Sequence, residues 1–246
     1  MGPQTDTPDY LVKLKKRFLV AEQTMAFQFE KPAGFTFRPG QWIDITLLEP
    51  IETDAEGDTR GFSITSAPHE DFLMVATRLR DTAFKRQLPH LPINTMVKIE
   101  GPGGDLRLHN NTAHEAVFLA GGIGITPIRS ILLHAAREKF AHKIFVFFSN
   151  RRPEDAPFLE ELTDLQKDNP NYTLIATMTD MGKSARSWNG DTSRIDQSLL
   201  AKYLTDVKAP IYYVVGPMGM VNGVHGMLNK AGVDDDDIRR EEFEGY

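Results

Sequence analysis

The stretch AVFLAGGIGITP, residues 116–127, decides the fold of the C-terminal half of this chain. It opens with an apolar run that reads as a strand buried on both faces. Gly122 and Gly124 then permit a tight turn and the close approach of a ligand to the backbone. Thr126 is a natural N-cap, and Pro127 suits the first position of a helix. The stretch predicts a strand, a turn and a helix, with these four residues at a bound dinucleotide.

The segments that follow repeat the alternation of strand and helix. Strands are expected at 116–120, 144–149, 172–179 and 211–215, with helices over 127–139, 156–167 and 218–230. This alternation is typical of a parallel sheet with crossover helices, and we expect an α/β domain from residue 113 to residue 246. The glycine turn departs from the Gly-x-Gly-x-x-Gly fingerprint, so a purely structural turn is the alternative interpretation.

Two further motifs lie at strand ends of the same expected sheet. Gly216, Pro217 and Met218 follow the last strand, at the carboxyl edge where ligands collect in open α/β folds. Asn150 and Arg151 follow the second strand, where a residue that distinguishes nucleotide riboses usually lies. A pair of arginines there, with no acidic residue at the strand end, favours NADP over NAD. Met218 can equally be a core residue.

The N-terminal half carries short alternating strands separated by turns rich in proline and glycine. Strands are expected at 11–20, 25–29, 42–47, 62–65, 72–78 and 96–100, with one short helix at 82–88. This spacing predicts an antiparallel β-barrel or sandwich. We place this first domain at residues 9–110.

The expected fourth strand contains Arg60, Phe62 and Ser63. A guanidinium suits a phosphate, because its planar fork presents several donors. Phe62 suits the face of a flat ring such as a flavin, and Ser63 suits a hydrogen bond to the flavin nitrogen that accepts hydride. In a regular strand Arg60 and Phe62 share one face and Ser63 lies on the other. A surface arginine beside a core phenylalanine is the alternative.

A second anion site is expected where Thr82 caps the short helix. The free backbone N–H groups of Ala83 and Phe84 follow the cap, and Lys85 adds positive charge, so a diphosphate would be attracted there. The preceding strand ends at Ala76 and Arg78, which we assign to the same cofactor site. An ordinary capped helix is the alternative interpretation.

Composition narrows the classes of function. The chain has 246 residues, a net charge of −6 and no cysteine. Without cysteine there is no disulfide, thiolate nucleophile or Cys-bound iron-sulfur cluster, and no metal site is expected from the scattered histidines. The acidic balance argues against a nucleic-acid partner. No apolar run spans a bilayer and no secretion signal begins the chain, so we expect a soluble, cytoplasmic protein.

Taken in order, the motifs resemble those of the ferredoxin-NADP reductase superfamily. Arg60 to Ser63 is similar to its Arg-x-Tyr/Phe-Ser flavin motif, and residues 121–127 are similar to its Gly-Gly-x-Gly-x-x-Pro nicotinamide motif. Residues 216–220 resemble the end of its Cys-Gly-Pro-x-x-Met element, although Val215 stands where cysteine is frequent. The ending at 242–246 resembles the carboxy-terminal tail of the superfamily.

The resemblance implies a flavin-binding β-barrel followed by an NAD(P)-binding α/β domain. It implies FAD rather than FMN, although Thr82-x-x-Lys85 replaces the usual Gly-x-x-Ser segment. NADP(H) or NAD(H) would be the donor. Catalytic roles are implied for Ser63 and Glu244, and Tyr246 would lie at the flavin, unless it only packs against the last strand.

The implied function is an NAD(P)H-dependent flavoprotein reductase that passes electrons to a separate acceptor. Cations within residues 78–86 suggest an acidic electron carrier such as ferredoxin or flavodoxin, steered by charge. Three alternatives stay open: a flavin-carrying subunit of a multicomponent enzyme, a reductase of a small-molecule acceptor, and a ligand sensor built on the same fold.

Overall fold

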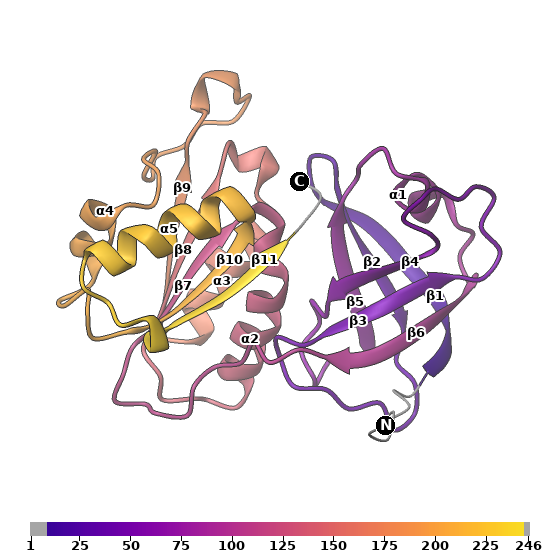
Figure 1. The fold of residues 1–246 in the computed structure, drawn as a ribbon, viewed down its shortest axis with the longest axis horizontal. Helices are drawn as coiled ribbons and strands as arrows, with labels where there is room; N and C mark the ends of the chain where they lie inside the picture. The colour runs from indigo at the N-terminus through magenta and orange to yellow at the C-terminus, as the bar shows by residue number, and fades with distance from the viewer. Residues whose placement is uncertain (1–8, 244–246) are drawn as a thin grey trace.

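The alternating apolar pattern of the N-terminal half folds into a six-stranded antiparallel sheet that curls into a barrel (Figure 1). The structure, a computed structural model, describes residues 9–243. The barrel strands, in the sheet order β4-β3-β6-β1-β2-β5, are β1 (Asp9–Ala21), β2 (Thr24–Glu30), β3 (Trp42–Leu47), β4 (Thr59–Ser63), β5 (Phe72–Arg78) and β6 (Met96–Gly103).

Inward-facing residues of these strands build the barrel core. Ile43 and Ile45 on β3 alternate with polar neighbours and are fully buried, as a period of two requires. Phe27 and Phe29 on β2, separated by the partly exposed Gln28, are also fully buried. The short helix α1 (Ala83–Gln87) adds Phe84, which is 1% exposed, to the same cluster. Burying one such aromatic side chain stabilises the fold by about 1.5–3 kcal/mol.

The C-terminal half forms a parallel sheet of five strands in the order β11-β10-β7-β8-β9. Its strands are β7 (Ala116–Gly121), β8 (Ile144–Asn150), β9 (Tyr172–Met178), β10 (Ile211–Pro217) and β11 (Ile238–Phe243). Its helices are α2 (Ile125–Arg137), α3 (Leu159–Asp168), α4 (Gln197–Tyr203) and α5 (Met218–Lys230). Short 3-10 turns lie at Leu88–His90, Gly122–Gly124, Pro153–Asp155, Met181–Lys183 and Asp235–Asp237.

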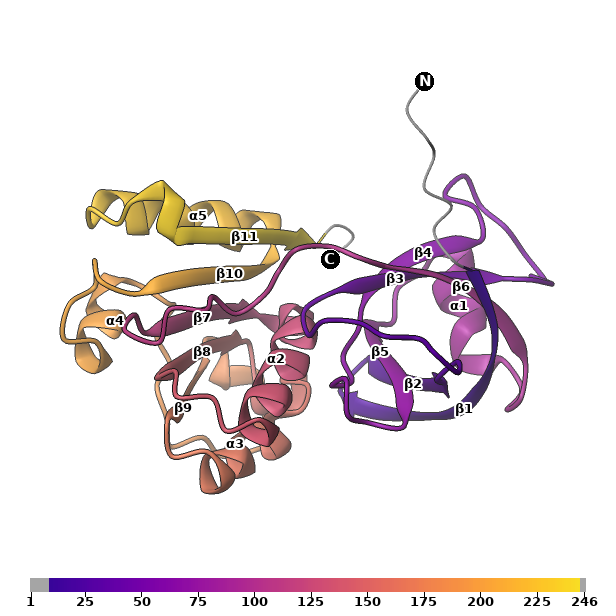
Figure 2. The ribbon, with the colours of Figure 1, turned by 90° about the horizontal axis from the view of Figure 1, so that it is seen from below.

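The central strand β7 explains the layered arrangement seen in Figure 2. Phe118 and Ala120 pack on one face with α2 and α3, whereas Val117 and Leu119 pack on the other face with α4 and α5. All six residues of β7 are buried, as expected of a parallel strand covered on both sides. The predicted fold class, an antiparallel β-barrel followed by a parallel α/β domain, is confirmed.

Three local predictions are wrong. The sheet has a fifth strand, β11, which pairs in parallel with β10. Its sequence is charged because it lies at the sheet edge, so no apolar run marks it. Strand β4 begins and ends earlier than expected, at Thr59 and Ser63. Helix α2 begins at Ile125 with Gly124 as N-cap, because the 3-10 turn at Gly122–Gly124 runs directly into it.

Strand β5 joins the two halves. Leu73 and Val75 point into the barrel core, while Met74 and Ala76 belong to the core cluster of the α/β half. The last barrel strand ends at Gly103 and the next strand begins at Ala116, and we keep 9–110 and 113–246 as the proposed domain limits. Within residues 9–243, no helix is long and apolar enough to cross a membrane.

Candidate functional site

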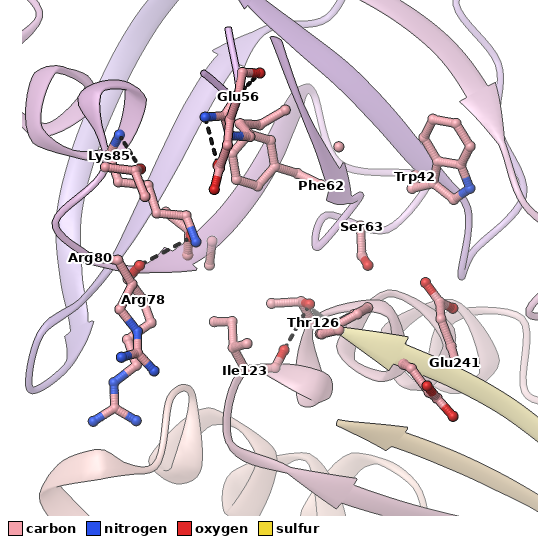
Figure 3. Close-up of a pocket in the computed structure, with 17 residues that line it drawn as sticks. Trp42, Glu56, Phe62, Ser63, Arg78, Arg80, Lys85, Ile123, Thr126 and Glu241 are labelled. Atoms are coloured by element: carbon pink, nitrogen blue, oxygen red, sulfur yellow. Dashed lines mark hydrogen bonds and ion pairs between the residues drawn. The ribbon is translucent and has the colours of Figure 1, made fainter. Parts of the chain in front are cut away.

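A pocket of about 650 Å³ opens between the barrel and the α/β half (Figure 3). The barrel contributes the ends of β3, β4 and β5 and the start of α1. The α/β half contributes the glycine turn, the first turn of α2 and the end of β11. Of the residues predicted from the sequence, this pocket is lined by Arg60, Phe62, Ser63, Ala76, Arg78, Thr82, Lys85 and Thr126.

Ser63 and Glu241 lie on facing walls of this pocket, with Trp42 beside Ser63 (Figure 3). Ser63 is the last residue of β4 and is 8% exposed. Because the strand ends there, Ser63 lines the same pocket as Arg60 and Phe62 rather than an opposite face. Burial raises the pKa of Glu241 to about 7, so this carboxyl can hold or release a proton near neutral pH.

The guanidinium of Arg60 is engaged by an acidic loop between β3 and β4. It lies 2.8 Å from the Glu56 carboxylate and 3.4 Å from Asp54, and it donates to the carbonyl oxygen of Gly57. The backbone N–H of Ala83, which we expected at a diphosphate, donates to Asp54 Oδ2 at 2.7 Å. This hydrogen bond is the main reason that the pKa of Asp54 lies below its ordinary value.

Three other cations face the pocket. Arg78, Arg80 and Lys85 make no ion pair within residues 9–243. Burial, Arg80 and Arg60 together lower the pKa of Lys85. The Nε atom of Arg80 is buried without a hydrogen-bond partner in the described part of the chain. Clustered positive charge with an unsatisfied buried donor fits a polyanionic group such as a diphosphate.

A second pocket, of about 710 Å³, adjoins the first and shares Arg78 and Arg80 with it. Gly122, Asn150, Arg151 and Pro217 are the residues predicted from the sequence that also line it. Asn150 is 7% exposed, and neither atom of its side-chain amide has a partner among residues 9–243. A buried amide beside a glycine turn fits a nucleotide that would satisfy it.

Some predicted residues lie outside both pockets. Ala83, Phe84, Gly124, Pro127, Gly216 and Met218 line neither of them. Phe84 packs on Phe62 in the barrel core, with ring centroids 5.8 Å apart. A Cβ at Gly124 would collide with the carbonyl oxygen of Val215, so this glycine serves close packing of the turn on β10. The predicted residues Glu244 and Tyr246 lie outside the described part of the chain.

Two predicted roles need correction. Thr126 is not the N-cap of α2: it lies inside the first turn, and its hydroxyl donates to the Ile123 carbonyl at 2.9 Å. Pro127 is accordingly the third residue of the helix rather than the first. Arg152, the second arginine of the expected NADP pair, is bound to Asp155 and Glu22, each at 2.8 Å.

The basic residues predicted as a docking surface lie at and beside the first pocket. Arg78, Arg80 and Lys85 line the pocket between the domains. Arg86 is paired with Glu52 at 2.6 Å and with Asp81 at 2.5 Å. Three of these four cations thus line the pocket, and the fourth is ion-paired, so docking of an acidic carrier on them stays a prediction.

Trp42, Arg194 and Glu241 line the pockets but were missed in the sequence. Trp42 pairs with Ser63 across β3 and β4, so recognising the register of those strands would have found it. Glu241 would have been found by reading residues 239–243 as a strand, since residues 239, 241 and 243 are the less exposed ones. Arg194 lies in a loop, and nothing in its local sequence signals its position.

Known proteins are similar to this chain in sequence and in fold. Residues 118–226 match the family described as the oxidoreductase NAD-binding domain. The glycine betaine monooxygenase reductase subunit of Chromohalobacter salexigens is 25% identical over 90% of this chain and 60% of its own length. One component of the Na(+)-translocating NADH-quinone reductase of Pseudoalteromonas atlantica is 34% identical over 84% of this chain and 54% of its own length. The chain thus spans a little over half the length of these relatives.

Solved structures share the whole fold. The flavohem-like FAD/NAD-binding domain of nitric oxide dioxygenase from Vibrio cholerae has a TM-score of 0.78 at 18% identity, covering 95% of this chain and 98% of that one. A ferredoxin NADP+ reductase from Neisseria gonorrhoeae, with bound FAD and NADP, has a TM-score of 0.77 at 19% identity and the same coverages.

The fold is shared with these solved structures, and the two adjoining pockets lie where the barrel meets the α/β half. The comparisons agree with the resemblance to ferredoxin-NADP reductase-like oxidoreductases that the motifs predicted: residues 118–226 match an NAD-binding domain, and the chain has the fold of the solved structures above. The matched relatives are named as components of reductases, in line with the predicted class of enzyme, and the matched domain and the solved structures are named for the two predicted classes of cofactor.

Proposed function

We propose that the chain holds FAD in the first pocket, takes electrons from NADPH in the second, and passes them to a separate acceptor protein. The observation that carries this proposal is the contact between the two pockets, which share Arg78 and Arg80 where the barrel meets the α/β half. Two cofactors in adjoining pockets can exchange a hydride only if both are held in contact, which such an arrangement allows.

The residues present fit a flavin nucleotide. Arg78, Arg80 and Lys85 would hold its diphosphate, and Ser63 would orient its ring by a hydrogen bond. When bound, a flavin accepts two electrons with a hydride and releases them singly, which links nicotinamide chemistry to one-electron carriers. Glu241, with its pKa near 7, would hold or release a proton on the wall opposite Ser63.

The second pocket supports NADPH as the donor. Gly122 and Pro217 bring backbone close to the nucleotide, and Asn150 offers an unsatisfied amide. Arg151 and Arg194 both line this pocket, and neither makes an ion pair within residues 9–243. Two such guanidinium groups suit the 2′-phosphate that distinguishes NADP from NAD.

A second candidate is the reductase component of a multicomponent enzyme. It is favoured because the matched relatives are named as the reductase subunit of a monooxygenase and as one component of a quinone reductase. A reductase of a small-molecule acceptor is the third possibility. The candidates differ in what accepts the electrons, not in the two pockets.

Anaerobic addition of NADPH to the FAD-loaded protein tests the proposal, with the flavin absorbance near 450 nm as the readout. We expect rapid bleaching with NADPH and slower bleaching with NADH. Re-oxidation by added one-electron protein carriers then identifies the acceptor class. A protein that takes up no FAD, or whose flavin is bleached by neither nucleotide, rules the proposed function out.

A further inference from the structure

Arg129, in the second turn of α2, is a buried charge that lines neither pocket. Its side chain is only 6% exposed, and it lies between the two domains. Within the α/β half it is held by Glu161 of α3, which accepts from Nη2 at 2.6 Å and from Nε at 2.8 Å. The guanidinium carbon also lies 5.2 Å from the centre of the Phe158 ring. These contacts within the α/β half orient the guanidinium toward the barrel.

The same guanidinium reaches into the barrel. Its Nη1 donates to the carbonyl oxygen of Thr65 at 2.7 Å and to the Glu70 carboxylate at 3.2 Å. The next residue of α2, Ser130, donates through its hydroxyl to the carbonyl oxygen of Ser66 at 2.6 Å. Two consecutive residues of α2 thus donate hydrogen bonds to the carbonyl oxygens of two consecutive barrel residues.

The barrel segment that Arg129 and Ser130 contact, residues 65–70, is also held by hydrogen bonds within the barrel. Glu70 accepts a hydrogen bond from the Ala67 N–H at 2.7 Å, and the Ser66 hydroxyl accepts one from the Met74 N–H at 2.9 Å. Thr65 and Ser66 are 0% exposed. A displacement of this segment would therefore carry the neighbouring end of β4 with it.

The contacts of Arg129 and Ser130 lie close in the chain to the two segments proposed to hold the cofactors. Thr65 and Ser66 follow closely after Ser63, and Arg129 and Ser130 lie on the helix that begins at the glycine turn. The bridge thus joins the two cofactor segments within a few residues of each. A second cross-domain ion pair among residues 9–243, Arg152 with Glu22, lies near the β1–β2 turn, where Glu22 is 51% exposed. That pair touches neither Ser63 nor the glycine turn.

We propose that Arg129, with Ser130, is a positioning residue for hydride transfer: it sets the separation and orientation of Ser63 relative to the glycine turn, and with them those of the two cofactor rings. This inference rests on the proposed function. Hydride transfer is sensitive to small displacements, and a misplacement of about 1 Å can cost on the order of 100-fold in rate. The residues proposed to hold the flavin diphosphate, Arg78, Arg80 and Lys85, all lie in the barrel, so loss of the bridge leaves their arrangement unchanged.

The test compares Arg129→Gln, Arg129→Lys and Ser130→Ala with the wild type, and with Arg137→Gln as a matched control on the exposed face of the same helix. We expect the rate constant of flavin reduction at saturating NADPH to fall about 10- to 100-fold in Arg129→Gln. Arg129→Lys keeps the positive charge but loses the planar guanidinium, so its rate constant should lie between those of the wild type and Arg129→Gln. FAD affinity should change less than about threefold, and Arg137→Gln should match the wild type.

A second readout needs no catalysis. Because the chain lacks cysteine, Lys15→Cys in the barrel and Lys230→Cys at the end of α5 can carry spin labels without background. Their distance distribution should broaden or shift in Arg129→Gln and stay unchanged in Arg137→Gln. If Arg129→Gln fails to fold, Arg129→Lys and Ser130→Ala carry the same comparison.

The outcomes separate the two proposals. A wild type whose flavin is never bleached by NADPH or NADH overturns the proposed function, and the spin-label distances then still test the bridge. A wild type that reacts, with Arg129→Lys and Ser130→Ala reacting at the same rate and showing the same distances, overturns the inference. Loss of thermal stability with unchanged reduction per bound flavin shows a structural role only and also overturns it.

Discussion

Glu241 illustrates how a single side chain acquires its chemistry from its surroundings. It lies among charged residues of a short edge strand, and only burial in the pocket wall raises its pKa from 4.5 to about 7. Arg60 shows the opposite effect. The sequence marks it as a phosphate ligand, but Asp54 and Glu56 already bind its guanidinium. At the scale of residues, the type and spacing of side chains predicted Arg60 as a site residue, whereas the pKa of Glu241 and the ion pairs of Arg60 depend on neighbours in space.

The raised pKa of Glu241 predicts a pH dependence of stability. The proton that Glu241 retains when folded contributes stability fully below about pH 4.5, and this contribution is lost as the pH rises through 7. The variant Glu241→Gln should therefore gain about 1–2 kcal/mol relative to the wild type between pH 4.5 and pH 8. Urea unfolding of the cofactor-free protein measures this, with exposed Glu242→Gln as control. Equal behaviour of the two variants would contradict the assigned burial.

At the scale of elements, the acidic loop between β3 and β4 is the part that local patterns did not explain. Its turn geometry brings Asp54 to the Ala83 N–H and to Arg60 at once. Strands β1 to β10 were predictable because period-two alternation and short apolar runs are local signals. Loop carboxylates carry no such period, so their partners become known only when strand pairing brings them together.

The loop predicts a gain of cofactor affinity on removal of one charge. On the proposed function, Asp54 would repel the flavin phosphates and hold Arg60 away from them, so Asp54→Asn should tighten FAD binding about 3- to 10-fold. Fluorescence titration with FAD measures the change. Asp58→Asn removes a charge from the same loop that makes no ion pair within residues 9–243, and it serves as control. An unchanged or weaker affinity for Asp54→Asn would count against competition at this site.

At the scale of the whole molecule, the second pocket, where we propose that NADPH binds, is lined by both domains. The barrel supplies Arg78 and Arg80, and the α/β half supplies Arg151 and Arg194. We expect Arg151→Ala and Arg194→Ala each to lower the ratio of kcat/KM for NADPH over NADH about tenfold, because each would remove a charge-assisted hydrogen bond to the 2′-phosphate. In Arg152→Ala the ratio should stay the same, because that arginine is bound to Asp155 and Glu22. Steady-state kinetics with both nucleotides measures this ratio. A shift in Arg152→Ala alone would contradict the assignment of Arg151 and Arg194 to the 2′-phosphate.

What the sequence by itself determined is the fold class, the succession of strands β1 to β10 with helices α1, α2, α3 and α5, and the motifs that end the strands; it did not reveal α4 or β11. These follow from hydrophobic period, glycine turns and helix signals within about a dozen residues. Only the tertiary structure decided that Arg129 grips Thr65, that Glu241 faces Ser63 and that Asp54 binds the start of α1. Burial and ion pairing depend on distance in space, and these partners lie 64 and 29 residues apart in the two hydrogen-bonded cases.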